Sequence, residues 1–119
     1  MYKDLIVWQK SIDLVKEVYV LTSKLPTREN YVLADQMRRA AISIPSNIAE
    51  GSGRSTRSEY KRFIEIARGS LYELQTQLYI AHELKYFDSD EIDKANYLLS
   101  EIGKMLNTLV KKLSTGPET

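Results

Sequence analysis

Hydrophobic side chains recur at steps of three and four residues through most of the chain, which is the spacing that lines one face of an α-helix. Four such stretches predict helices over residues 4–22, 29–50, 57–86 and 89–113. Short connections between amphipathic helices favour antiparallel neighbours. The sequence therefore predicts an all-α fold, an antiparallel up-down-up-down four-helix bundle, formed by a single domain over residues 1–119.

The second predicted helix contains Pro45 between two contrasting rows. Its apolar row lies beside a row that is polar throughout, namely Gln36, Arg39, Ser43, Asn47 and Glu50. An interior proline removes one backbone donor and crowds the preceding turn, at a cost of ~3 kcal/mol. We therefore predict a bend at Pro45, with a split into two helices as the alternative, and a contact outside the monomer for the polar row.

Glycine and capping residues predict where the second helix ends and the third begins. Gly51 and Gly53 are expected to stop the second helix, because glycine readily adopts the left-handed conformation after a helix C-terminus. Thr56 and Glu59 have the spacing of a capping box, in which each side chain bonds a free backbone N–H of the first turn.

Composition limits the compartment and the chemistry. Hydrophobic content of 43% and charged content of 28% are typical of a soluble globular domain, and the absence of Cys excludes disulfides and thiolate metal sites. No apolar run approaches the ~20 residues of a membrane-spanning helix. Met1 to Asp4 lacks the basic region of a signal peptide. We expect a cytoplasmic protein with no membrane contact.

Positive charge is concentrated in the middle of the chain. Residues 38–68 hold seven Lys and Arg and three Glu, a net +4, although the whole chain is only +1. The segment leads into a predicted helix N-terminus, where free N–H groups favour anions. One interpretation is contact with RNA or DNA phosphates. The residues assigned to it are Arg38, Arg39, Arg54, Arg57, Lys61 and Arg62. The alternative is a solvated face in which the Arg side chains pair with Glu50, Glu59 and Glu65.

An amphipathic row, which we call the tyrosine row, follows one side of the third predicted helix. Its members are Arg68, Tyr72, Gln75, Tyr79, His82 and Tyr86. Tyr and Arg are enriched in protein interfaces, so we predict an interface between subunits. Plain exposure and stacking on nucleic-acid bases are the alternatives.

Enzymatic interpretations have little support in the sequence. His82 is the single histidine, so two-histidine metal motifs are absent and a Ser–His pair would have to use it. An enzyme that uses Glu50 and Arg68 is the remaining catalytic hypothesis. We expect no catalytic residues, no metal and no cofactor.

Several blocks of residues resemble a known family. They are Leu25-Pro26, Gln36 to Ala40, Ser43 to Pro45, Asn47 to Gly51, Arg57 and Ala67 to Leu74. In this order and spacing, the chain resembles the four-helix-bundle proteins encoded by intervening sequences within bacterial 23S rRNA genes. That family is similar in fold to the accessory protein of diversity-generating retroelements, a pentamer that works with a reverse transcriptase and nucleic acid. The resemblance implies a ring-shaped homopentamer with no established enzymatic activity.

Two functional hypotheses follow from the residues and the resemblance together. The first is a non-catalytic homo-oligomeric binding module with RNA or another nucleic acid as its ligand. The second is a protein–protein interaction scaffold that does not bind nucleic acid and uses the polar row of the second helix and the tyrosine row of the third as its contact surfaces.

Overall fold

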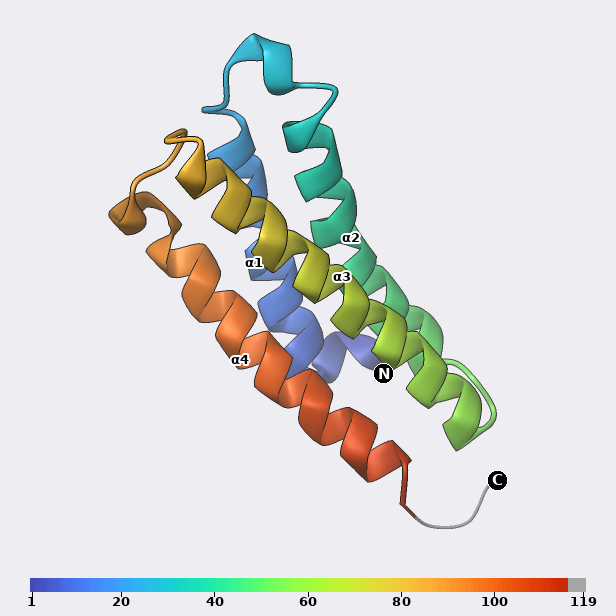
Figure 1. The fold of residues 1–119 in the computed structure, drawn as a ribbon. Helices are drawn as coiled ribbons and strands as arrows, with labels where there is room; N and C mark the ends of the chain where they lie inside the picture. The colour runs from blue at the N-terminus through green and yellow to red at the C-terminus, as the bar shows by residue number, and fades with distance from the viewer. Residues whose placement is uncertain (116–119) are drawn as a thin grey trace.

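The computed structural model describes residues 1–115, and these form four α-helices and two short 3₁₀ helices. The α-helices are α1 (Ile6–Thr22), α2 (Leu33–Ser52), α3 (Arg57–Glu83) and α4 (Ser89–Leu113), and the 3₁₀ helices are η1 (Tyr2–Asp4) and η2 (Thr27–Glu29). Consecutive helices run in opposite directions along the long axis of the molecule (Figure 1). The predicted all-α antiparallel four-helix bundle is therefore confirmed.

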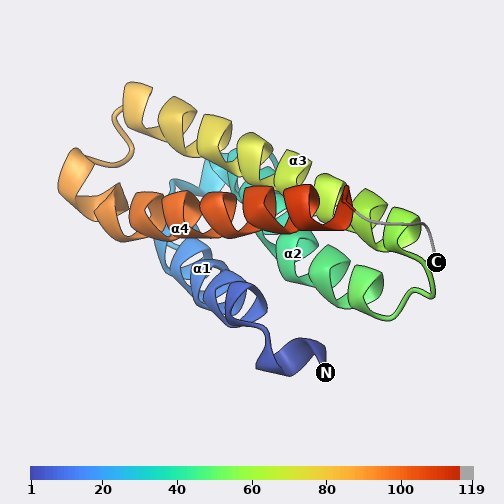
Figure 2. The same ribbon diagram turned by 90° about the horizontal axis from the view of Figure 1, so that it is seen from below.

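Each α-helix packs against two neighbours. α1 and α3 both contact α2 and α4, and Figure 2 shows α1 and α3 at opposite edges of the bundle. The resulting body measures 49 × 24 × 22 Å. Its core is formed by the apolar rows that the periodicity predicts. The buried members include Leu14, Val18, Met37, Ala41, Ile44, Ile48, Ile64, Leu71, Leu74, Leu78, Ala95, Leu99, Ile102 and Leu106.

α2 begins four residues after the predicted start and continues through Pro45 as a single helix. The connection before it contains η2 and ends at Val32. Two side chains bond backbone carbonyls close to the proline: Ser46 Oγ donates to Ile42 O at 2.8 Å, and Asn47 Nδ2 donates to Ser43 O at 2.8 Å. A split into two helices is wrong, and the bend at Pro45 stays a prediction.

Of the two glycines that were expected to end α2, Gly53 does so, but neither adopts the left-handed conformation. Gly51 lies inside the helix and is buried, and Gly53 is the C-cap with an ordinary φ of −90°. A left-handed residue appears instead at Lys85, whose φ is 65°. There α3 ends at Glu83, three residues earlier than predicted, because Tyr86 N–H bonds Ala81 O at 3.0 Å and Lys85 N–H bonds His82 O at 2.9 Å. This pair of bonds defines a Schellman C-terminus.

The start of α3 is capped by one side chain and not by the expected reciprocal pair. Thr56 Oγ1 accepts a hydrogen bond from Glu59 N at 3.1 Å, but the Glu59 carboxylate accepts from the Thr56 hydroxyl at 3.2 Å. The complete capping box lies at the start of α4. Asp88 accepts from Glu91 N at 2.8 Å, and Glu91 accepts from Asp88 N at 3.0 Å.

Within residues 1–115, none of the helices combines the length and the apolar character needed to cross a membrane.

Candidate functional site

Arg38, the first residue of the predicted phosphate-binding set, is used inside the bundle. Its Nε donates to Thr22 Oγ1 at 3.0 Å, and its guanidinium lies 5.6 Å from the centre of the Tyr19 ring. Thr22 is buried and donates in turn to Val18 O at 2.8 Å. Arg38 therefore joins α2 to α1, which restricts the freedom of its side chain to meet a ligand.

Two further arginines are paired with carboxylates one helical turn away. Arg39 Nε lies 3.0 Å from Asp35 Oδ2, and Arg54 Nη2 lies 2.7 Å from Glu50 Oε2. Arg54 also covers the Phe63 ring at 4.7 Å. The Arg54–Glu50 pair is the arrangement of the solvated-face alternative, whereas the partner of Arg39 is an aspartate that the sequence interpretation did not include.

The remaining three cations surround the first turns of α3. Arg57 Nη1 donates to the carbonyl oxygen of Thr115, so it connects the start of α3 to the end of α4. Lys61 is half-buried and Arg62 is exposed. Among the contacts of residues 1–115, neither has a hydrogen bond or an ion pair. Of the six predicted residues, these two keep their charges open to a partner.

Arg68 and Tyr86, the two ends of the predicted tyrosine row, also form hydrogen bonds within the chain. Arg68 Nη1 donates to Asn107 Oδ1 on α4 at 3.1 Å. The Tyr86 hydroxyl donates to Glu29 Oε2 at 2.7 Å, and the guanidinium of Arg28 lies 5.9 Å from the Tyr86 ring centre. Tyr86 therefore fastens η2 to the end of α3.

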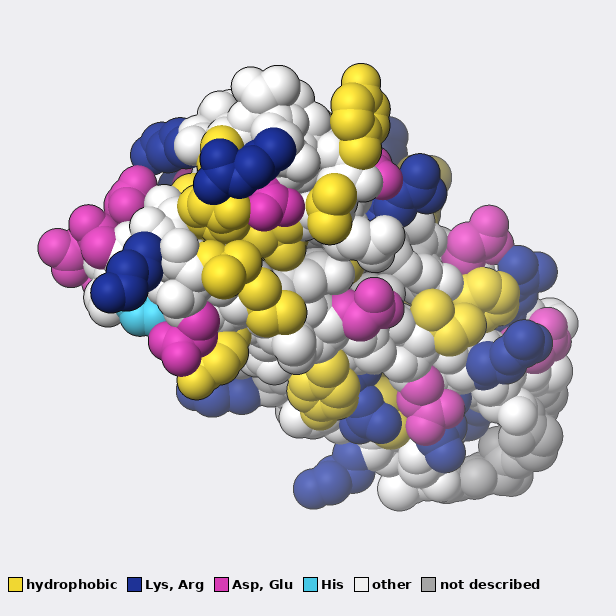
Figure 3. Space-filling view, turned by 45° about the horizontal axis from the view of Figure 1, so that its top comes forward, with side chains coloured by type: hydrophobic (Ala, Val, Ile, Leu, Met, Phe, Trp, Pro, Cys, Tyr) yellow, Lys and Arg dark blue, Asp and Glu magenta, His cyan; other side chains and the backbone are white. Residues whose placement is uncertain are grey.

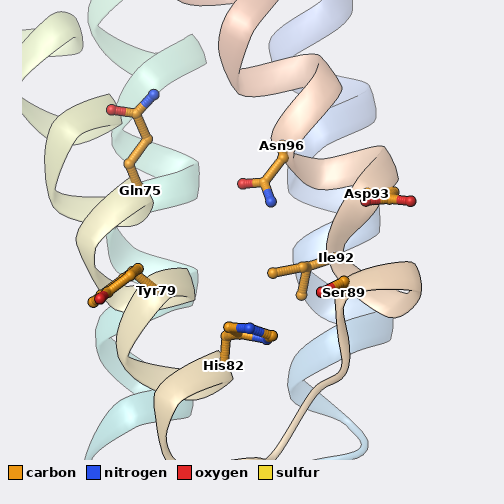
Figure 4. Close-up of a pocket in the computed structure, with 7 residues that line it drawn as sticks. All are labelled: Gln75, Tyr79, His82, Ser89, Ile92, Asp93 and Asn96. Carbon is orange, nitrogen blue, oxygen red and sulfur yellow. The ribbon is translucent and has the colours of Figure 1, made fainter.

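The middle of the row forms one wall of a pocket between α3 and α4. Gln75, Tyr79 and His82 line it from α3, and Figure 4 shows the facing wall on α4. The pocket volume is about 450 Å³, and the α4 lining residues are Ser89, Ile92, Asp93 and Asn96. Tyr72, the other tyrosine of the row, is exposed beside this wall.

His82 is oriented by the turn that follows α3. Its Nδ1 lies 3.1 Å from the Phe87 carbonyl oxygen. Because a carbonyl only accepts, Nδ1 carries the proton, and Nε2 of the neutral ring is left as an acceptor.

The two residues of the catalytic hypothesis, Glu50 and Arg68, bind the different partners described above and do not form a pair with each other.

The centre of the polar row on α2 packs against α3, whereas its ends lie on the surface. Ser70 Oγ donates to Ser43 Oγ at 2.8 Å, and Asn47 Nδ2 lies 2.9 Å from the same oxygen. The centre of the row therefore supports packing of α2 on α3. Gln36, Arg39 and Glu50 remain on the surface.

Sequence reasoning missed an apolar component of the outer face of α3. Large apolar side chains on this helix remain 42–63% exposed, namely Ile66, Tyr72, Tyr79, Ile80 and Leu84 at its end. Figure 3 shows hydrophobic side chains emerging between charged ones on this side of the molecule. The sequence did contain a signal for this surface. Ile66 and Ile80 are apolar, yet they lie outside the row of α3 residues that fills the core.

The arrangement of these helices and surfaces defines a small antiparallel four-helix-bundle protein with an outward-facing apolar strip. The model of the 23S rRNA-intervening sequence protein family matches residues 3–108. The chain belongs to this family.

A solved structure has the same fold. It is a protein of unknown function from the S23 ribosomal protein family of Bacteroides thetaiotaomicron VPI-5482, with a TM-score of 0.83 and 23% sequence identity over 89% of this chain and 99% of that chain. No curated protein sequence matches the chain.

Proposed function

We propose that the protein is a non-catalytic module that assembles with copies of itself through the outer face of α3. The observation that carries this proposal is the exposed apolar strip from Ile66 to Leu84. Exposed apolar side chains that cluster along one helix are characteristic of protein interaction sites, and tyrosine is enriched in them.

The strip by itself is smaller than a standard interface. From Ile66 to Leu84 it covers ~27 Å of α3 and about one helix diameter, ~10 Å, in width, which gives ~300 Å². A standard protein–protein interface takes about 800 Å² from each partner. The strip would therefore form the apolar centre of the contact with a second copy, and the polar surface beside it would form the rim.

Gly69 supports close approach of that second copy. It lies in the interior of α3 on the exposed side, and apart from its chain neighbours and the adjacent backbone of α3 no atom lies within 4 Å of the position of an added Cβ. Glycine inside a helix costs about 1 kcal/mol relative to alanine. Packing within the monomer gives no reason for this cost, whereas a neighbouring subunit that approaches the bare backbone would offset it.

Sedimentation or light scattering tests the proposal. The wild-type chain of 13.7 kDa is expected to form a larger species, and its mass reports the subunit number, which the family resemblance puts at five. Ile80→Glu is expected to shift the chain towards monomer, because it places a charge in the apolar strip. Val20→Glu is the matched control, since Val20 is 51% exposed but lies on α1. A monomeric wild-type protein, or Ile80→Glu with wild-type assembly, would overturn the proposal.

Gly69→Ala gives a more specific test. The added methyl should favour the helix yet weaken assembly if the bare backbone contacts a neighbour. Gly103→Ala is its control, because the new methyl would meet Leu71 at 3.8 Å inside the bundle. Unchanged assembly of Gly69→Ala would show that the glycine has no role in the interface.

Nucleic-acid binding is a second candidate function. The observation in its favour is the adjacent pair Lys61 and Arg62, which has no ion pair among the described residues and lies near the N-terminus of α3. Binding to phosphates through them should weaken as salt rises. The test is an RNA mobility shift at roughly 50 and 200 mM salt with Lys61→Glu/Arg62→Glu. Lys16→Glu/Lys85→Glu makes the same charge change elsewhere. Equal binding by both double variants would exclude this site.

A further inference from the structure

An apolar groove lies where the start of α1 meets the last turns of α4. Its volume is about 580 Å³, and its lining is mainly apolar. Its apolar lining residues are Leu5, Ile6, Val7, Met105 and Leu109, of which Ile6 is 60% exposed. Apolar pockets of a few hundred Å³ with a small number of polar groups are typical of small-molecule sites.

The polar groups on this groove are positively charged. Lys104 and Lys112 both line it, and their separation of eight residues corresponds to ~12 Å along α4. Both are exposed, and neither has an ion pair among residues 1–115. Asp4 also lines the groove, but its Oδ2 lies 3.6 Å from the N-terminal ammonium of Met1. Among the described residues, neither lysine therefore forms an ion pair with a carboxylate, although Asp4 lies on the same groove.

We propose that this groove binds an anionic amphiphile, a small carboxylate with an aliphatic body such as a medium-chain fatty acid. The aliphatic body would cover Leu5, Met105 and Leu109, which removes apolar surface from water. The carboxylate would bind Lys104 or Lys112 at the rim. This ligand class matches an apolar floor next to unpaired cations, and the site is separate from the α3 face proposed for assembly.

Methionine methyl NMR with decanoate below its micellar concentration tests this site. Met105 lines the groove, whereas Met37 is fully buried in the core. Saturable shifts of the Met105 methyl with an unchanged Met37 methyl are expected. No shift of Met105, or equal shifts of both methyls from general loosening of the bundle, would overturn the proposal.

Charge variants test the chemical class of the ligand. Lys104→Gln/Lys112→Gln should weaken decanoate binding on the order of fivefold, the upper end for one exposed ion pair. Lys16→Gln/Lys85→Gln is the matched control and should bind like wild type. Equal affinity of the two double variants, or of decanoate and decanol, would show that the lysines do not select the ligand. A Met105 shift that follows protein concentration without decanoate would instead assign the groove to a second copy.

Discussion

Gly51→Ala is expected to force α2 and α3 apart where Gly51 lies against Tyr60 and Phe63. An added Cβ would lie 2.9 Å from Phe63 Cβ, 2.9 Å from Tyr60 Cδ1 and 3.2 Å from Tyr60 O. Optimal separations between carbon atoms are ~3.5–4.0 Å. Because Phe63 Cβ and Tyr60 O are fixed to the backbone of α3, a side-chain rotation cannot relieve these contacts. One of the helices must move by several tenths of an ångström.

The magnitude follows from two opposing terms. Overpacking of this kind costs about 1–3 kcal/mol. Replacing a helical glycine by alanine returns about 1 kcal/mol. We therefore expect a net loss of about 1 kcal/mol, or about 4 °C in Tm for a domain of this size. Gly103→Ala should gain about 1 kcal/mol, because its methyl would make ordinary contacts with Leu71 at 3.8 and 3.9 Å.

Urea denaturation at one fixed protein concentration measures the difference between the two variants, which should be about 2 kcal/mol. The Tyr60 ring gives a local readout. Burial raises the pKa of Tyr60 above the usual 10.0, and separation of the helices should lower that pKa towards this value. If Gly51→Ala is as stable as Gly103→Ala, the close approach of α2 and α3 at Gly51 does not limit packing.

Three further substitutions test other parts of the fold. Leu74→Asp should abolish cooperative thermal unfolding, because it puts a carboxylate at a fully buried position; a normal transition would contradict the core assignment. Lys85→Gly should raise the free energy of unfolding by about 1 kcal/mol, since glycine adopts the φ of 65° without strain. Lys85→Ala, which keeps the strain, serves as its control. Tyr86→Phe should cost about 1 kcal/mol by removing the 2.7 Å hydrogen bond to Glu29, and most of this loss should disappear in a Glu29→Ala background, which has no side-chain acceptor.

The positions of neighbouring helices determine which residues the charged side chains contact. The sequence shows a basic segment, but it does not show that Arg38 reaches Thr22 or that Arg57 reaches the end of α4. Those contacts join residues far apart in the chain. Within the predicted phosphate-binding set, Lys61 and Arg62 are the two residues without a hydrogen bond or an ion pair among the described residues. The apolar strip on α3 becomes visible only once the buried face of that helix is known.

The sequence by itself determined the four helices and their buried rows, because the period of 3.6 residues is a local property that each stretch carries independently. It did not determine how deeply each apolar residue of α1 is buried: Val18 is fully buried, while Tyr19 is 46% exposed beneath Arg38. It also assigned the left-handed residue to a glycine after α2, whereas the structure has it at Lys85. These outcomes depend on where neighbouring helices lie, since packing against α2 and α4 outweighs the local preference of a single residue.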